Sequence, residues 1–292
     1  MIQALRPIVF LSAIAALAGP LAAAPPATQS PVLPAKMLAG WNQYVDATQQ
    51  RIAGEMAGQP RFLALDFGAS AAADRAALLA GGMPVSEGHS VKAGGGDIEV
   101  SDAWVHHWRG AVLIPRVTLD QVFARLQASV PGSGQGDVLT SAILSRNGSS
   151  MRVFIKVQRQ VRVLATLKFV YNTEHEVAFT RRDAQHGSST SVAMKIAELD
   201  DAGTPTEREY RHGDDNGFLW RWNSYWRYEQ VAAGVIAECE SITLSRTAPF
   251  GLGLIAGRFE KGEGPASMTR ALVNLRQHFA AGQTPHASLP VR

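Results

Sequence analysis

The densest group of side chains suited to ligand binding lies between residues 218 and 228. Alternate side chains of a β-strand point to opposite faces of its sheet. One face of this stretch would carry five aromatic rings and a serine, namely Phe218, Trp220, Trp222, Ser224, Trp226 and Tyr228. Such rings offer large contact areas, and an indole N–H or a phenol O–H can orient a polar group. The pattern predicts either core beneath a covering helix or the wall of a ligand cavity, formed by Trp220, Trp222, Trp226 and Tyr228.

The opposite face of the same stretch carries two arginines, Arg221 and Arg227. The next strand-like stretch, 235–244, carries Glu238 and Glu240, so an antiparallel hairpin would bring acidic and basic side chains together. If the rings point inward, these pairs point outward, and we expect them to be exposed and to contribute little to stability. The alternative is that Arg227 lies in the cavity wall and binds a ligand head group.

A second polar group is the His-His-Trp-Arg sequence at 106–109, inside a strand-like stretch at 104–115. Neighbouring strand residues point to opposite faces, so the two histidines cannot bind one metal ion together. A histidine in a cavity could transfer protons, and His107 and Arg109 are our candidates, although an inward histidine is more often a core residue. The alternation alone leaves open which face of 104–115, or of 235–244, points inward.

Nothing in the sequence indicates a metal or a cofactor. The remaining histidines lack HExxH or HxH spacing. The single cysteine, Cys239, excludes an internal disulfide framework and a zinc–thiolate cluster. Gly251, Gly253 and Gly257 only approach a dinucleotide fingerprint, and we interpret them as a loop before the last helix. We therefore expect no cofactor and no metal site.

The composition restricts the class of protein. Hydrophobic residues make up 46% of the 292 residues and charged residues 18%, which is enough apolar material for a core and excludes a disordered chain. The formal net charge of +3 gives no reason to expect nucleic acid as a partner.

The first 24 residues have the pattern of a secretory signal peptide. Arg6 precedes an apolar run at 8–18, and the small, Ala-rich residues that follow are typical of a cleavage site near Ala24. The run is shorter than the roughly 20 apolar residues that a membrane span needs. We therefore expect cleavage and no stable membrane insertion afterwards. Because the Ala-, Gly- and Arg-rich composition suggests a bacterium, we expect a secreted, periplasmic protein.

The chain after the signal peptide divides by composition into four parts. We expect a flexible linker at 25–35, an N-terminal extension of a helix and short strands at 36–103, a main domain at 104–282 and a disordered tail at 283–292. In the extension, the spacing of apolar residues predicts helices at 37–56 and 71–80 and a short strand at 61–67.

The main domain predicts an α+β fold. A strand at 104–115 is followed by a helix that Thr118 and Gln121 can cap and by a short helix at 137–145. Strands are then expected at 151–160, 162–172, 174–182, 188–199, 218–228 and 235–244. The short connections require an antiparallel sheet. A helix at 266–281 would cover it with an apolar stripe of Met268, Leu272, Leu275 and Phe279.

This order of elements resembles the START-like helix-grip superfamily, also called SRPBCC. The stretches at 107–110, 217–227 and 235–246 are similar to exported bacterial members of it. The resemblance covers residues 104–282. It implies a curved antiparallel sheet of about seven strands around a long C-terminal helix, with an apolar cavity between them. Members bind lipids, sterols, polyketides or other hydrophobic molecules, and no universal catalytic set comes with the fold.

Three functions follow as hypotheses. The first is an exported binding protein that holds a small hydrophobic or lipid-like ligand. The second is a cyclase- or aromatase-like enzyme in which His107, Arg109 or Arg227 transfers protons or polarises a carbonyl. The third is a structural or partner-binding envelope protein whose interior is filled by its own side chains. A histidine paired with a carboxylate or an arginine inside the cavity would favour the enzyme, so the three hypotheses differ in the content of the cavity.

Overall fold

The computed structural model describes residues 33–58, 60–134, 136–162, 166–211, 213–247 and 253–280. Its helices are α1 (Ala35–Ala57), the short 3-10 helix η1 (Ala64–Phe67), α2 (Ala71–Leu79), α3 (Leu119–Ala128) and α4 (Gly253–Ala280). Its strands are β1 (Val85–Glu87), β2 (Ala103–Pro115), β3 (Val138–Asn147), β4 (Ser150–Arg162), β5 (Thr166–Arg181), β6 (His186–Asp200), β7 (Arg208–Glu209), β8 (Arg221–Val231) and β9 (Gly234–Arg246).

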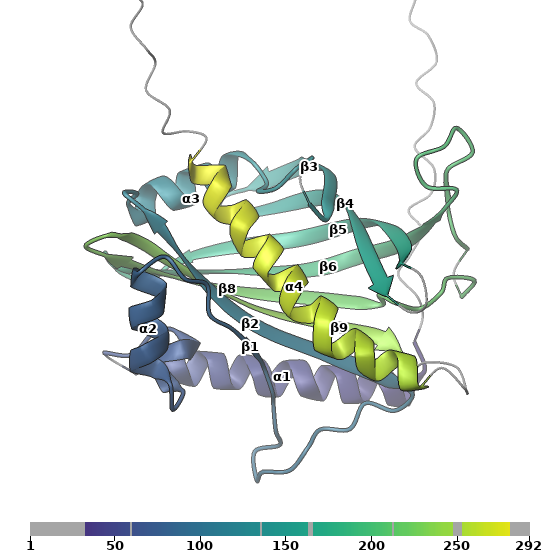
Figure 1. Ribbon diagram of the computed structural model, residues 1–292, viewed down its shortest axis with the longest axis horizontal. Coiled ribbons are helices and arrows are strands. Elements are labelled where there is room, and N and C mark those ends of the chain that lie inside the picture. Colours follow the sequence, from purple (N-terminus) through teal and green to yellow (C-terminus); the bar gives the residue numbers. More distant parts are fainter. Residues whose placement is uncertain are drawn as a thin grey trace, which may run out of the picture.

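Within these described residues, nine strands form one antiparallel sheet in the order β1-β2-β9-β8-β6-β5-β4-β3, with β7 paired to β6 beside this path. The long strands from β3 to β9 follow one another along the chain, through short connections except at residues 201–220, which contain β7 and lead from β6 to β8. The first long strand, β2, then pairs with the last, β9, along its whole length. Helix α4 follows β9 and crosses one face of the sheet (Figure 1). The predicted α+β fold, an antiparallel sheet packed against a C-terminal helix, is confirmed.

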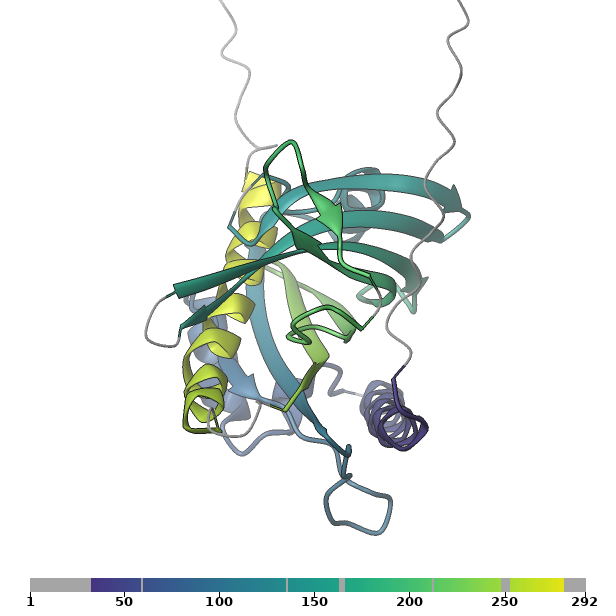
Figure 2. The same cartoon turned by 90° about the vertical axis from the view of Figure 1, so that its right-hand side faces the viewer.

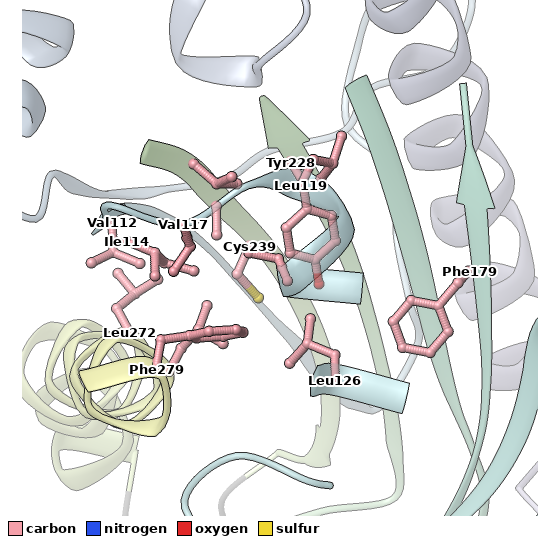
Figure 3. Close-up of a cluster of buried hydrophobic side chains, with 14 of the residues drawn as sticks. Val112, Ile114, Val117, Leu119, Leu126, Phe179, Tyr228, Cys239, Leu272 and Phe279 are labelled. Atoms are coloured by element: carbon pink, nitrogen blue, oxygen red, sulfur yellow. The ribbon is translucent and has the colours of Figure 1, made fainter. Parts of the chain in front are cut away.

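The face of the sheet beneath α4, called here the α4 face, carries the largest apolar core. Met268, Leu272, Leu275 and Phe279 of α4 are buried there, as the sequence predicts. The core extends to Tyr228 and Cys239 on the sheet and beneath α3 (Figure 3). At Gly110 of β2, a Cβ atom would lie 2.8 Å from Met268 Cγ, so glycine allows helix and sheet to approach closely at this point.

The opposite face of the sheet, called here the α1 face, is covered by the N-terminal extension. Helix α1 lies on the other side of the sheet from α4 (Figure 2). Its residues Met37, Trp41 and Tyr44 pack against Tyr225 and Ile242 of the sheet. The segment around η1 and α2 forms a smaller cluster with the neighbouring ends of β2 and β9. Strand β1 pairs with β2 and forms one edge of the sheet.

Local signals placed most of the helices correctly. The Thr118 hydroxyl accepts a hydrogen bond from the Gln121 amide, and Gln121 Oε1 accepts one from the Thr118 amide, so the predicted capping box begins α3. Helices α1 and α2 also agree with the predicted ranges 37–56 and 71–80.

Four elements differ from the prediction. Residues 138–147 form the edge strand β3 and not a helix, because their backbone pairs with β4 in a register that no local pattern encodes. The two strands expected at 162–172 and 174–182 are one strand, β5, paired along its length with β4. Residues 64–67 form η1 and not a strand, and α4 already begins at Gly253, inside the expected loop.

Several predictions fall outside the described residues. These are the signal peptide at 1–24, the linker up to residue 32 and the tail at 283–292. In the part of the chain that the structure describes, no helix is long and apolar enough to cross a membrane.

Candidate functional site

A cavity of about 260 Å³ lies between the α4 face of the sheet and helix α4. Strands β2, β4, β5, β6, β8 and β9 provide its floor, residues 130–131 and the start of β3 close one end, and α4 covers it between Glu263 and Leu275. The cavity adjoins the apolar core, since Met268 and Leu275 belong to both. It is therefore an extension of the core that side chains do not fill.

Indole rings form much of the apolar wall. Trp222 and Trp226 project into the cavity from β8, and Trp108 projects from β2. Trp108 lies so close to α4 that a Cβ atom at Gly264 would collide with its ring. The Trp222 indole N–H lies 3.0 Å from the Ser224 hydroxyl and 3.1 Å from that of Ser241. Its polar atom is thus satisfied by the wall, which leaves the ring face available for contact.

Two histidines, His106 and His175, lie in the floor of the cavity. His175 is buried, its Nδ1 and Nε2 hydrogen-bond the hydroxyls of Ser191 and Thr173, and its ring meets Trp222 edge-on. His106 Nε2 hydrogen-bonds Ser245 at 2.9 Å. Burial lowers the pKa of both histidines to about 4, and in His106 the charge of a neighbouring arginine adds to this effect. Both rings are therefore neutral at neutral pH.

That neighbouring arginine, Arg159 of β4, is the cationic group of the cavity floor. Its guanidinium carbon lies 5.7 Å from the centre of the Trp222 ring, within the range of a cation–π contact. Among the described residues, no carboxylate oxygen lies within 4.0 Å of a guanidinium nitrogen of Arg159, so none forms an ion pair with it. Burial lowers the pKa of Arg159 from its usual value, and the nearby Arg270 adds to this lowering, against the opposite influence of Tyr171 and Asp137.

The acidic side chains at the cavity rim are held by another arginine. Asp137 Oδ2 lies 2.9 Å from Nε of Arg270 on α4, and Glu263 lies 3.6 Å from the same guanidinium group. Ser267 also donates a hydrogen bond to Asp137. These contacts connect α4 to the start of β3. They also pair both carboxylates with Arg270 and not with Arg159.

The α1 face holds a second polar group, buried beneath the N-terminal extension. His107 Nε2 lies 2.5 Å from Glu240 Oε1, and His107 Nδ1 lies 2.8 Å from the Tyr44 hydroxyl. Arg51 of α1 also contacts Glu240. Burial acts to raise the pKa of Glu240, but the hydrogen bond from His107 and the charges of Arg51 and Arg227 outweigh it and hold the pKa at about 2.

Arg227 and Glu238 lie beside this group on the α1 face. They are opposite each other in the strand register, yet Arg227 makes its shortest contact, 2.6 Å, with Glu55 of α1. The Glu238 carboxylate accepts hydrogen bonds from the amides of Ala64 and Leu65 at the start of η1. The expectation of exposed pairs is wrong, because Arg227 and Glu238 are 2% and 4% exposed beneath the extension.

The candidate residues from the sequence are thus distributed over both faces. Trp222 and Trp226 line the cavity. Tyr228 shares their face but packs in the core beside Trp226, and its hydroxyl hydrogen-bonds Ser189. Trp220 precedes β8 and packs on the α1 face, with its N–H donated to Asp215. The remaining three lie on the α1 face, away from the cavity, namely His107, Arg109 and Arg227.

Sequence reasoning missed two polar residues of the cavity, Arg159 and His175, and of the two neighbouring histidines it chose His107 where the structure places His106 in the cavity. A signal for Arg159 is present in β4, where the inward positions 151, 153, 155 and 157 are all apolar and the next is Arg159. A charged residue at the next inward position of such a strand indicates that its side chain points to the interior side of the sheet, where apolar residues are expected. The histidines carry no such signal, because polar and apolar residues alternate less regularly in β2 and β5.

Comparison with known proteins gives structural similarity alone. No protein-family model matches the chain, and no curated protein matches its sequence. A StAR-related lipid transfer protein from Xanthomonas axonopodis is 16% identical, with a TM-score of 0.35, over 62% of this chain and 96% of its own.

Two further solved structures are similar to a comparable extent. The lipid transfer and protein localization domain of human StarD13 is 6% identical, with a TM-score of 0.39, over 73% of this chain and 98% of its own. The Zhui aromatase/cyclase of a Streptomyces species is 13% identical, with a TM-score of 0.34, over 64% and 100%. Since all three TM-scores lie below 0.5, the fold class rests on this chain's own strand order and on α4.

Proposed function

We propose that this protein is a START-like helix-grip binding protein that holds a small hydrophobic or lipid-like ligand between its sheet and α4. The observation that carries the proposal is the cavity of about 260 Å³, walled by Trp108, Trp222 and Trp226 and continuous with the apolar core. Largely apolar cavities with a few polar groups are the usual form of small-molecule sites. An unfilled interior of this kind disfavours the structural alternative with a filled core.

The enzyme alternative receives less support from the geometry. An acid–base pair needs a histidine and its carboxylate on the same side as the substrate. The buried pair His107 and Glu240 lies on the α1 face, whereas the cavity histidines His106 and His175 hydrogen-bond hydroxyl groups. A binding function requires no such pair.

An environment-sensitive fatty-acid probe tests the binding proposal. We expect it to bind and to quench tryptophan fluorescence, because three of the six tryptophans line the cavity. Trp222→Ala removes a large ring from the wall and should weaken probe binding by on the order of 10-fold. Trp41→Phe is the control, since Trp41 is buried on the α1 face and should leave binding unchanged. A folded wild-type protein that binds no probe would favour the structural alternative.

We further propose that the protein acts after export, in the bacterial periplasm. The signal-peptide pattern of residues 1–24 supports this proposal. The intact mass of the secreted protein should correspond to an N-terminus within a few residues of Ala24. A full-length chain retained in the inner membrane would contradict it, and native mass spectrometry of the secreted form would identify a co-purified ligand.

A further inference from the structure

We infer that the ligand of this cavity is an amphipathic anion, an apolar molecule with one carboxylate head group, and that Arg159 binds the head group. The inference rests on the proposed binding function and specifies its ligand class. It depends on the position of Arg159, which lines the same cavity as Trp222 and Trp226.

Among the residues whose side chains the structure describes, no carboxylate forms an ion pair with Arg159. Its close partner in the described ranges is the Trp222 ring at 5.7 Å. Arg159 is half-buried, and charges that are partly withdrawn from water are commonly paired, because an unpaired one costs free energy. A guanidinium group in a cavity wall therefore favours a ligand that brings a negative charge.

Arg159 is the group in the cavity floor that can attract an anion by its charge, because the neighbouring charged and titratable groups are paired or neutral. Asp137 and Glu263 both contact Arg270, which is thereby neutralised at the rim. His106 and His175 are neutral at neutral pH, since burial holds the pKa of each at about 4. Neither histidine repels a cation nor binds an anion by charge under these conditions, so Arg159 supplies the positive potential in the floor.

The shape of the site matches an anion attached to an apolar body. Arginine presents a planar fork of N–H donors that binds a carboxylate through two parallel hydrogen bonds. The tryptophan rings and the apolar residues Ile155, Met268 and Leu275 line the same space. A carboxylate at Arg159 would thus leave the rest of the ligand in contact with rings and aliphatic side chains.

The test compares decanoate with 1-decanol, which has the same chain length and no charge, by titration calorimetry at about pH 7.5. We expect wild-type protein to bind decanoate on the order of 10-fold more tightly than decanol. Arg159→Met keeps an unbranched stem against Trp222 and should abolish this preference while decanol still binds. Arg159→Lys, which keeps a point charge without the planar fork, should retain part of it.

The chain offers a matched control in Arg152. It is on the same strand, its side chain is exposed and pairs with Glu174 at 3.0 Å, and it points to the other face of the sheet. Arg152→Met makes the same change in net charge and should keep the preference for decanoate. Acetate, a head group without a tail, should bind far more weakly than decanoate, whereas decyl phosphate reports whether the site also accepts a phosphate.

The outcomes separate the two levels of the proposal. Equal binding of decanoate and decanol, unchanged in Arg159→Met, would overturn the inference and leave the hydrophobic cavity in place. Equal loss of preference in Arg152→Met and Arg159→Met would assign it to net charge and also overturn the inference. Binding of neither compound by folded protein would overturn the proposed function together with the inference.

Discussion

His107 and Glu240, on neighbouring strands β2 and β9, form a buried pair 2.5 Å apart on the side of the sheet that faces away from the cavity. With the pKa of His107 lowered by burial and that of Glu240 held at about 2, the carboxylate is charged and the imidazole neutral at neutral pH. The imidazole then donates from Nε2 to Glu240 and accepts at Nδ1 from the Tyr44 hydroxyl. This pair joins α1 to the sheet and has no access to a ligand in the cavity.

The same buried group predicts a large effect of Arg227→Met. The substitution removes the cation that faces Glu238 and one of the two arginines that contact Glu55, and loss of one partner of a buried ion pair costs about 3–5 kcal/mol. Urea denaturation should show a decrease of this size in the free energy of unfolding. Arg208→Met is the control, because Arg208 pairs with Asp200 at the surface and should cost less than about 1 kcal/mol. Similar losses in both variants would contradict the buried network.

Two glycines of α1 should respond to alanine in opposite directions. A Cβ atom at Gly40 would lie 2.6 Å from the Glu99 carbonyl oxygen, whereas one at Gly54 would meet nothing within 4 Å. Gly54→Ala should stabilise the fold by about 0.5–1 kcal/mol through helix propensity. Gly40→Ala should destabilise the fold by about 1–3 kcal/mol, because the backbone of α1 and that of residues 99–100 must move apart. Thermal midpoints that rise in both variants would mean that α1 does not approach residues 99–100.

Helix α4 should tolerate a charge on one side and not on the other. Leu272 is fully buried against the α4 face, so Leu272→Asp places a carboxylate in apolar surroundings and should cost at least about 4 kcal/mol. Thr269→Asp introduces the same group on the exposed side of the helix and should change stability little. The comparison requires only thermal midpoints, and equal midpoints for the two variants would contradict the packing of α4.

The buried histidines predict that stability decreases in acid. Because the pKa of His175 is about 4 in the folded protein and about 6.5 when unfolded, the unfolded chain binds more protons between these values. The free energy of unfolding therefore decreases as the pH falls from about 6.5 to about 4, by at most roughly 3 kcal/mol for this group. Glu238 acts in the opposite sense, since burial raises its pKa to about 6 and favours the protonated form in the fold.

Variants can assign this pH dependence. His175→Gln should show a smaller decrease in the free energy of unfolding than wild type when urea denaturation is repeated across this range. His89→Gln should behave as wild type, because the His89 side chain is 62% exposed. An unchanged pH dependence in His175→Gln would show that His175 is not buried as a neutral ring.

The sequence by itself determined the features that depend on neighbours along the chain. The capping box at Thr118 begins α3, and the apolar stripe from Met268 to Phe279 marks the buried side of α4. The alternation in 218–228 placed Trp222 and Trp226 on one face. Short connections between strand-like stretches excluded crossovers and so required an antiparallel sheet. Each of these follows from the geometry of one helix, one strand or one turn.

Only the tertiary structure decided which of those faces are buried, and by what. Arg227 and Glu238 were expected at the surface, since nothing local shows that α1 and η1 cover their side of the sheet. Residues 138–147 form a strand because β4 provides their hydrogen-bonding partner, a contact that their own exposed side chains do not predict. Arg159 of β4 contacts the ring of Trp222 of β8, although two other strands, β5 and β6, lie between β4 and β8 in the sheet. Such relationships arise from strand order and register, which bring together residues far apart in the chain.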